Sequence, residues 1–152
     1  MIPTLLQDFL VEEIKKLDFK GKNVEGKLVS FNVYPQFLPA KKGIKDTAHF
    51  PYATVIVKEG EDPNEVDPYT CKIVLMFGVY DTDENYQGYK DILNVLQKTY
   101  DHLMRTKIFK NLYSIEYPIF WAIHEEDTFP YFFGALETNW TIAKTSIVDA
   151  LT

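Results

Sequence analysis

The sequence contains a single cysteine, Cys71, so no disulfide can form within the chain. Cys71 lies in an apolar segment, and a cysteine in such a place is typically a small buried hydrophobic side chain rather than a nucleophile. A chain without disulfides fits a reducing compartment, which favours the cytoplasm of a cell.

Long apolar runs are missing as well. The longest uncharged apolar stretch covers residues 73–80, whereas a membrane-spanning helix needs about 20 residues. Near the N-terminus, Asp8, Glu12 and Glu13 interrupt the apolar positions before the core of a signal peptide is reached. We therefore expect a soluble protein that is not exported and has no membrane partner.

The sequence has little positive charge. Its 16 lysine and arginine residues oppose 22 aspartate and glutamate residues, giving a formal net charge of -6. Because a phosphate backbone is bound through a basic face, tight binding to nucleic acid is not expected. The only basic cluster is Lys41, Lys42 and Lys45, within an aperiodic loop predicted at 35–50. Long loops in compact domains are often functional, so these lysines are candidate contacts for an acidic partner, with a solvated loop as the alternative.

Motifs that would supply catalysis or bind a cofactor are also missing. There is no glycine-rich phosphate loop and no serine in a glycine-flanked turn. Asp81, Asp83 and Asn85 have the spacing that opens a calcium loop, but Tyr86 replaces the required glycine and Ile92 the terminal glutamate. The pattern favours an acidic turn in which Asp83 or Asn85 accepts hydrogen bonds from the start of a helix.

A second acidic group, His124 to Asp127, consists of consecutive residues whose side chains diverge, and no second histidine lies at ligand spacing. The sequence therefore predicts no catalytic residue, no cofactor and no metal. A metal-binding domain or enzyme that uses Asp81, Asp83 or His124 to Asp127 stays open as an alternative from a different functional class.

The residues that are present predict one compact domain over 1–143, followed by a short tail at 144–152. The chain has 152 residues and is 46% hydrophobic, which is enough for one buried core. Apolar spacing predicts helices over about 3–17 and 89–106. Alternating apolar residues predict strands over 27–34, 52–58, 71–80, 113–123 and 131–143, with Pro118 marking an edge or a bulge.

This order predicts an α/β (α+β) fold with a mixed or mostly antiparallel sheet of about five strands and two helices on one face. The aromatic content, 15% of residues, exceeds what one small core hides easily. Some aromatic side chains are therefore expected at an interface, and the candidates are Tyr113, Tyr117, Trp121 and Phe133.

Three phrases of the sequence resemble a known family. They are FPYATVIV, then VYDTDENYQGYKDILNVLQ after an acidic loop, and finally EEDTFPYFFGALETNW. In this order, over roughly 50–142, they are similar to tail terminator, or tail completion, proteins of long-tailed bacteriophages and prophages.

The resemblance implies a non-enzymatic assembly protein that forms a homo-oligomeric ring, typically a hexamer, on the head-proximal end of the tail tube. Its partners would be the tail tube protein and the head-tail connector protein. It would be part of the virion, in the tail or neck, after assembly in the host cytoplasm. Another neck or head-tail joining protein of the same phage module, or an acidic protein that occupies a host partner, stays open.

Overall fold

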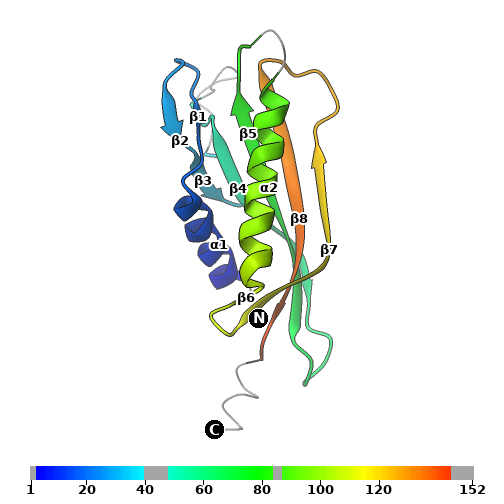
Figure 1. Ribbon diagram of the computed structural model, residues 1–152. Coiled ribbons are helices and arrows are strands. Elements are labelled where there is room, and N and C mark those ends of the chain that lie inside the picture. The colour runs from blue at the N-terminus through cyan, green and yellow to red at the C-terminus, as the bar shows by residue number, and fades with distance from the viewer. Residues whose placement is uncertain (1–2, 40–47, 84–86, 145–152) are drawn as a thin grey trace.

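The computed structural model describes residues 3–39, 48–83 and 87–144. Two helices and eight strands follow one another along the chain (Figure 1). In order, they are α1 (Thr4–Leu17), β1 (Lys20–Lys22), β2 (Leu28–Ser30), β3 (Asn32–Pro35), β4 (Tyr52–Glu61), β5 (Tyr69–Tyr80), α2 (Gly88–Thr106), β6 (Ile108–Phe109), β7 (Tyr113–Ile123) and β8 (Tyr131–Ile142). Both predicted helices are confirmed within one or two residues.

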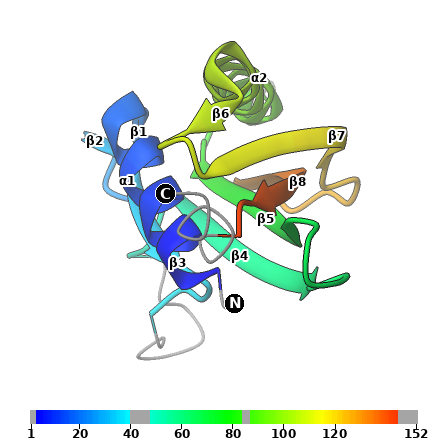
Figure 2. The same cartoon turned by 90° about the horizontal axis from the view of Figure 1, so that it is seen from below.

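The main sheet has six strands in the order β3-β4-β5-β8-β7-β6. All neighbours are antiparallel except β3 and β4, and β1 and β2 form a separate antiparallel pair. The sheet curls, and both helices lie on its inner side, α1 against β3 and β4 and α2 against β5, β8 and β7 (Figure 2). The predicted α+β class is confirmed, with six strands in place of about five.

One core lies between the helices and the sheet. In β5 the odd-numbered residues Ile73, Leu75 and Phe77 are fully buried, as the alternation predicted. Leu10 of α1 and Ile92 of α2 meet this face and are equally buried. Further core residues are Leu6, Ile14, Val55, Leu96, Leu103, Leu136 and Trp140.

Two polar side chains inside this core, Trp140 and Thr138, are paired. The indole Nε1 of Trp140 donates to Thr138 Oγ1 at 2.8 Å, and Thr138 Oγ1 donates to the carbonyl of Ile73 at 2.7 Å. The first bond lies within β8, and the second links β8 to β5. Burial therefore leaves neither side-chain group without a partner, which would be costly.

The strand predicted at 27–34 is divided at Phe31, and this part of the prediction is wrong. Phe31 packs on Phe19 with ring centroids 5.9 Å apart, and its N–H donates to the carbonyl of Phe19 at 2.8 Å. The chain thereby leaves β2 and enters β3 in the other sheet. β1 was not predicted, and β4 and β5 are longer than the strands predicted at 52–58 and 71–80, since they reach Glu61 and start at Tyr69.

Pro118 marks a bulge, as predicted. The pairing of β7 with β8 is regular from Tyr113 to Glu116 and resumes at Phe120. Within this gap Asn139 Nδ2 donates to the carbonyl of Pro118 at 2.7 Å. The Asn139 side chain of β8 thus bonds the backbone of β7 at the point where Pro118, which has no N–H, interrupts the backbone pairing.

The last described residue, Lys144, was expected to begin the tail, but it is buried with 8% of its surface exposed. Its ammonium group donates to the carboxylate of Asp62 and to the carbonyl of Asn64. It also lies over the ring of Tyr69, 4.5 Å from the centroid. These contacts tie the end of β8 to the β4–β5 loop, while the rest of the predicted tail lies outside the described residues.

Candidate assembly surface

The outer edge of β7 is open along most of its length. β8 pairs with one side of β7, whereas β6 pairs only with Tyr113 and Ser114 on the other side. One further bond runs from the N–H of Ile115 to the carbonyl of Lys107 at 3.0 Å. From 119 to 123 no other described strand pairs with this edge, which forms one side of the molecule (Figure 1).

Two backbone hydrogen bonds show which groups this edge presents. The N–H of His124 donates toward β8, to the carbonyl of Phe133, whereas that of Ile115 points away from β8. Peptide groups alternate between the two sides of an antiparallel strand. The bulge keeps this alternation in phase, because three residues of β7 oppose one of β8 between the pairs Glu116–Asn139 and Phe120–Glu137, a difference of two residues. The N–H and C=O groups of Ile119, Trp121 and Ile123 therefore point outward.

This edge segment, residues 119–123, is apolar and uncharged, with Phe120, Trp121 and Ala122 exposed and the two isoleucines half-buried. Phe120 is 56% exposed on the outer face of the sheet, opposite Glu137, and Trp121 is 63% exposed on the helix face, opposite Leu136. Tyr117, just before it, is 68% exposed. Trp121 also borders a hollow of about 540 Å³ between α2 and the sheet, lined by Leu93, Leu96, Gln97, Tyr100, Ile119 and Leu136.

On the opposite side of the sheet, the edge of β4 that extends beyond β3 is closed by side chains. Beyond the end of β3, Gln36 Oε1 accepts from the N–H of Val57 at 2.9 Å, and Gln36 Nε2 donates to the carbonyl of Val57 at 3.0 Å. Gln7 Nε2 donates to Gln36 Oε1 and to the carbonyl of Val55, each at 2.9 Å. The amide of Gln36 thus replaces one residue of a neighbouring strand, and further along β4 the charges of Lys58 and Glu59 protect the edge.

The four predicted aromatic contacts are in different surroundings. Tyr117 and Trp121 are on the open edge. Phe133 is half-buried on the outer face, with its ring 5.9 Å from that of Phe50. Tyr113 is only 5% exposed, which corrects the expectation that it meets a partner, because it points to the helix side and packs on Phe9 at 5.8 Å. Burial also raises the pKa of the Tyr113 hydroxyl.

The predicted basic contacts Lys41, Lys42 and Lys45 lie outside the described residues. The described parts of the loop predicted at 35–50 are ordered by specific bonds. Asn32 Nδ2 donates to the carbonyl of His49 at 3.0 Å, and Gln36 caps β4 as described above. Sequence reasoning missed Gln36, and its position just after a strand, without periodicity around it, gave no signal of this function.

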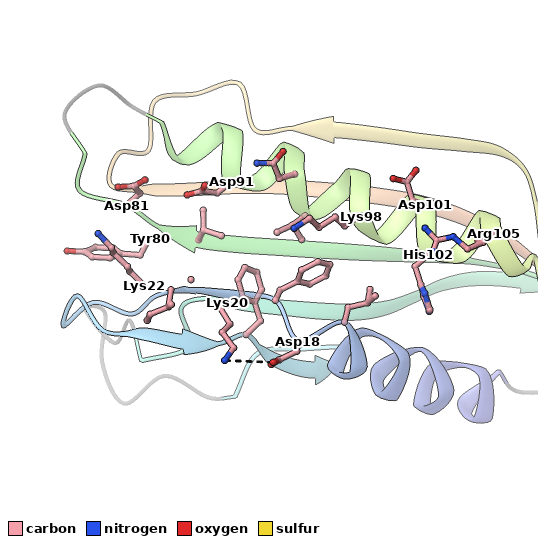
Figure 3. A pocket seen from close by; sticks show the side chains of 18 residues that line it. Asp18, Lys20, Lys22, Tyr80, Asp81, Asp91, Lys98, Asp101, His102 and Arg105 are labelled. Atoms are coloured by element: carbon pink, nitrogen blue, oxygen red, sulfur yellow. Dashed lines mark ion pairs between the residues drawn. The ribbon is translucent and has the colours of Figure 1, made fainter.

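A groove of about 710 Å³ lies between the β1–β2 hairpin and α2 (Figure 3). Its apolar floor includes Phe19, Phe31 and Val79, and its rim carries both signs of charge in equal number. The charged residues are Asp18, Asp81, Asp91 and Asp101, with Lys20, Lys22, Lys98 and Arg105. The groove therefore has no net sign that would select a charged ligand.

At one end of this groove Asp81 and Asp91 face the same space (Figure 3). Burial raises the pKa of Asp91, the charge of Asp81 raises it further, and Lys22 opposes the shift. A raised carboxyl pKa is one requirement for acid–base chemistry, but the rim supplies no nucleophile beside it. We assign no reaction to this groove.

The other sequence candidates for chemistry do not gather. Asp81 Oδ1 accepts from the N–H of Asp83 at 2.9 Å, which makes a local acidic turn, and Asn85 is outside the described residues. His124 Nε2 is 4.0 Å from Glu126 Oε2, both largely exposed. In the part of the chain that the structure describes, no three histidine, cysteine or acidic residues are grouped as metal ligands would be. Burial raises the pKa of Cys71 to about 11, which disfavours its thiolate.

A polar contact connects the two helices. His102 Nε2 lies 2.9 Å from Glu13 Oε2, and the Glu13 side chain is only 13% exposed. Burial raises the pKa of Glu13, but hydrogen bonds from His102 and Lys16 outweigh this effect and leave the pKa lowered. This pair stabilises the approach of α1 to α2 and lies beside the mixed-charge groove, which His102 also lines.

Comparison with protein-family models and with curated proteins gives no match for this chain. Among residues 3–39, 48–83 and 87–144, neither helix is long and apolar enough to cross a membrane.

Proposed function

We propose that this protein is a non-enzymatic assembly subunit of a long-tailed phage, a tail terminator that forms a ring on the tail tube and joins it to the head connector. The proposal starts from the resemblance of residues 50–142 to that family. The observation that carries it further is the open edge of β7, because an exposed, uncharged, apolar strand edge is a template for pairing with another chain.

Charge supports the same proposal. A ring through which DNA passes has to let the DNA slide, and a chain with a net charge of -6 would not hold a phosphate backbone tightly. Rings close through head-to-tail contacts between two different surfaces of the subunit. The β7 edge would be one of these surfaces, with Tyr117, Phe120 and Trp121 as its aromatic contacts.

The test is to mix the purified protein with tail tubes of the same phage and examine the tube ends by electron microscopy. We expect a ring at one end of each tube and an arrest of tube growth. Phe120→Ser should abolish the ring, whereas Asn94→Ala, on the exposed side of α2, should preserve it. Tubes that continue to grow, without a ring, would contradict the proposal.

A different neck or head-tail joining protein of the same module is the alternative, and the same material separates the two. A joining protein would bind the head connector and leave tube growth unchanged. Binding to the connector and to the tube end together is the result expected of a terminator.

A further inference from the structure

We infer that the β7 edge is self-complementary, and that free subunits pair as a two-fold dimer through residues 119–123, strand against antiparallel strand. The inference does not depend on the proposed function. A two-fold contact uses the same patch on both subunits and cannot close a ring. Under the proposed function, the dimer would be the form of the subunit before ring assembly, and it would open when the edge meets a different surface.

The backbone permits this pairing in one favourable register. The outward-pointing residues are Ile119, Trp121 and Ile123, and a two-fold axis at Trp121 places Ile119 of one copy opposite Ile123 of the other. Trp121 then faces its own counterpart. Each of the three residues donates one backbone hydrogen bond to the second copy and accepts one from it, so every outward peptide group from 119 to 123 is satisfied.

The side chains fit the same register. On the outer face of the sheet, Phe120 of one copy lies opposite Ala122 of the other, so that a large exposed ring meets a small exposed residue at both ends. Moving the register by one outward residue would place Phe120 against Phe120 or Ala122 against Ala122. On the helix face the two Trp121 rings meet beside the hollow under α2, which leaves them room to pack.

Charge favours a second copy of this chain as the partner that binds the β7 edge. The edge segment carries no charge itself, but charged residues flank it. Beyond Ile123 the chain carries Glu125 and Glu126. At the other end Lys107 lies 5.8 Å from the centroid of the Tyr117 ring, and the carboxylate of Glu116 accepts from Thr141 Oγ1 at 3.0 Å. The antiparallel register brings Glu125 of each copy opposite Tyr117 and Lys107 of the other, so this pair attracts at both ends of the dimer, while Glu126 falls opposite Glu116.

The first test is the mass of the free protein, followed by sedimentation equilibrium over a range of concentrations. We expect a reversible monomer–dimer equilibrium with no larger species. Trp121 should change its surroundings on dimerisation, so its fluorescence should shift to shorter wavelength as the concentration rises. In Trp121→Phe the remaining Trp140, which is 1% exposed, should show no such shift.

A charge exchange tests the register. Lys107→Glu places like charges at both ends of the dimer, and so does Glu125→Lys, so each variant alone should raise the dissociation constant about tenfold. A mixture of the two variants restores opposite charges at both ends and should form the heterodimer with nearly the original affinity. Both residues are exposed, and unchanged thermal unfolding would show that the variants fold.

Three results would overturn the inference. One is a protein that stays monomeric at the highest attainable concentration. Another is a dimer that the mixed charge variants do not restore, which would place the contact elsewhere. The third is a monomer in which the backbone amides of 119–123 are protected from hydrogen exchange only when tube protein is added. Rings on tubes without a free dimer would leave the proposed function intact, and a dimer that never binds tubes would leave this inference intact.

Discussion

Leu96 is the residue at which the packing of α2 is tested most directly. It lies at the centre of the apolar side of α2, is 4% exposed, and contacts the sheet close to Gly134, where an added Cβ would lie 3.3 Å from Leu96 Cδ1. Removing three carbons from such a site by Leu96→Ala costs about 2–5 kcal/mol. Leu96 also borders the hollow under Trp121, into which neighbouring side chains and water can relax. We therefore expect the lower half of this range.

The assay is urea unfolding followed by circular dichroism, with thermal unfolding as a second measurement. A loss of about 3 kcal/mol corresponds to a fall in Tm of about 6–12 °C for a chain of this size. The denaturant slope should not change, because the same surface is exposed on unfolding. Asn94→Ala is the control: Asn94 is on the exposed side of the same helix and has high solvent exposure, so its loss should cost less than about 0.5 kcal/mol.

Equal losses for the two variants would refute the reasoning, since they would mean that the face of α2 toward the sheet is assigned wrongly. A loss well above 5 kcal/mol for Leu96→Ala would also contradict it. That result would show that the hollow does not relax.

Three further changes test other parts of the structure. Because the pKa of Glu13 is lowered in the folded state, its stabilisation is present above the unfolded value of 4.5 and is lost as the pH falls through the folded value; Glu13→Gln should flatten this loss in acid unfolding curves. Gln36→Ala should lower the unfolding free energy by about 1–3 kcal/mol and speed hydrogen exchange at the Val57 amide, and unchanged exchange there would contradict the capping of β4. Gly134→Ala should cost about 1–3 kcal/mol in thermal unfolding, because its Cβ would lie 2.3 Å from Ile92 Cγ2, and an unaltered Tm would refute this close packing.

The sequence predicted the kind of site, an aromatic interface, but not which residues form it. The excess of aromatic residues indicated an interface, and Tyr117 and Trp121 are indeed exposed. Alternation along 113–123 could not separate these two from Tyr113, because all three are on alternate positions of one strand. What separates them is coverage: Tyr113 packs against Phe9 and is 5% exposed, whereas Tyr117 and Trp121 are 68% and 63% exposed.

The sequence by itself determined the local elements and their faces. Periods of 3.6 and 2 residues located α1, α2, β5 and β8, and Pro118 marked the bulge, because side-chain direction and the missing N–H of proline are properties of the local backbone. Only the tertiary structure decided which strand edges are open. Gln36 caps β4 and Lys144 reaches Asp62 from distant parts of the chain, contacts that no local pattern encodes. The open edge of β7 likewise follows from the order of strands in the sheet, which depends on how the helices bury their apolar sides against it.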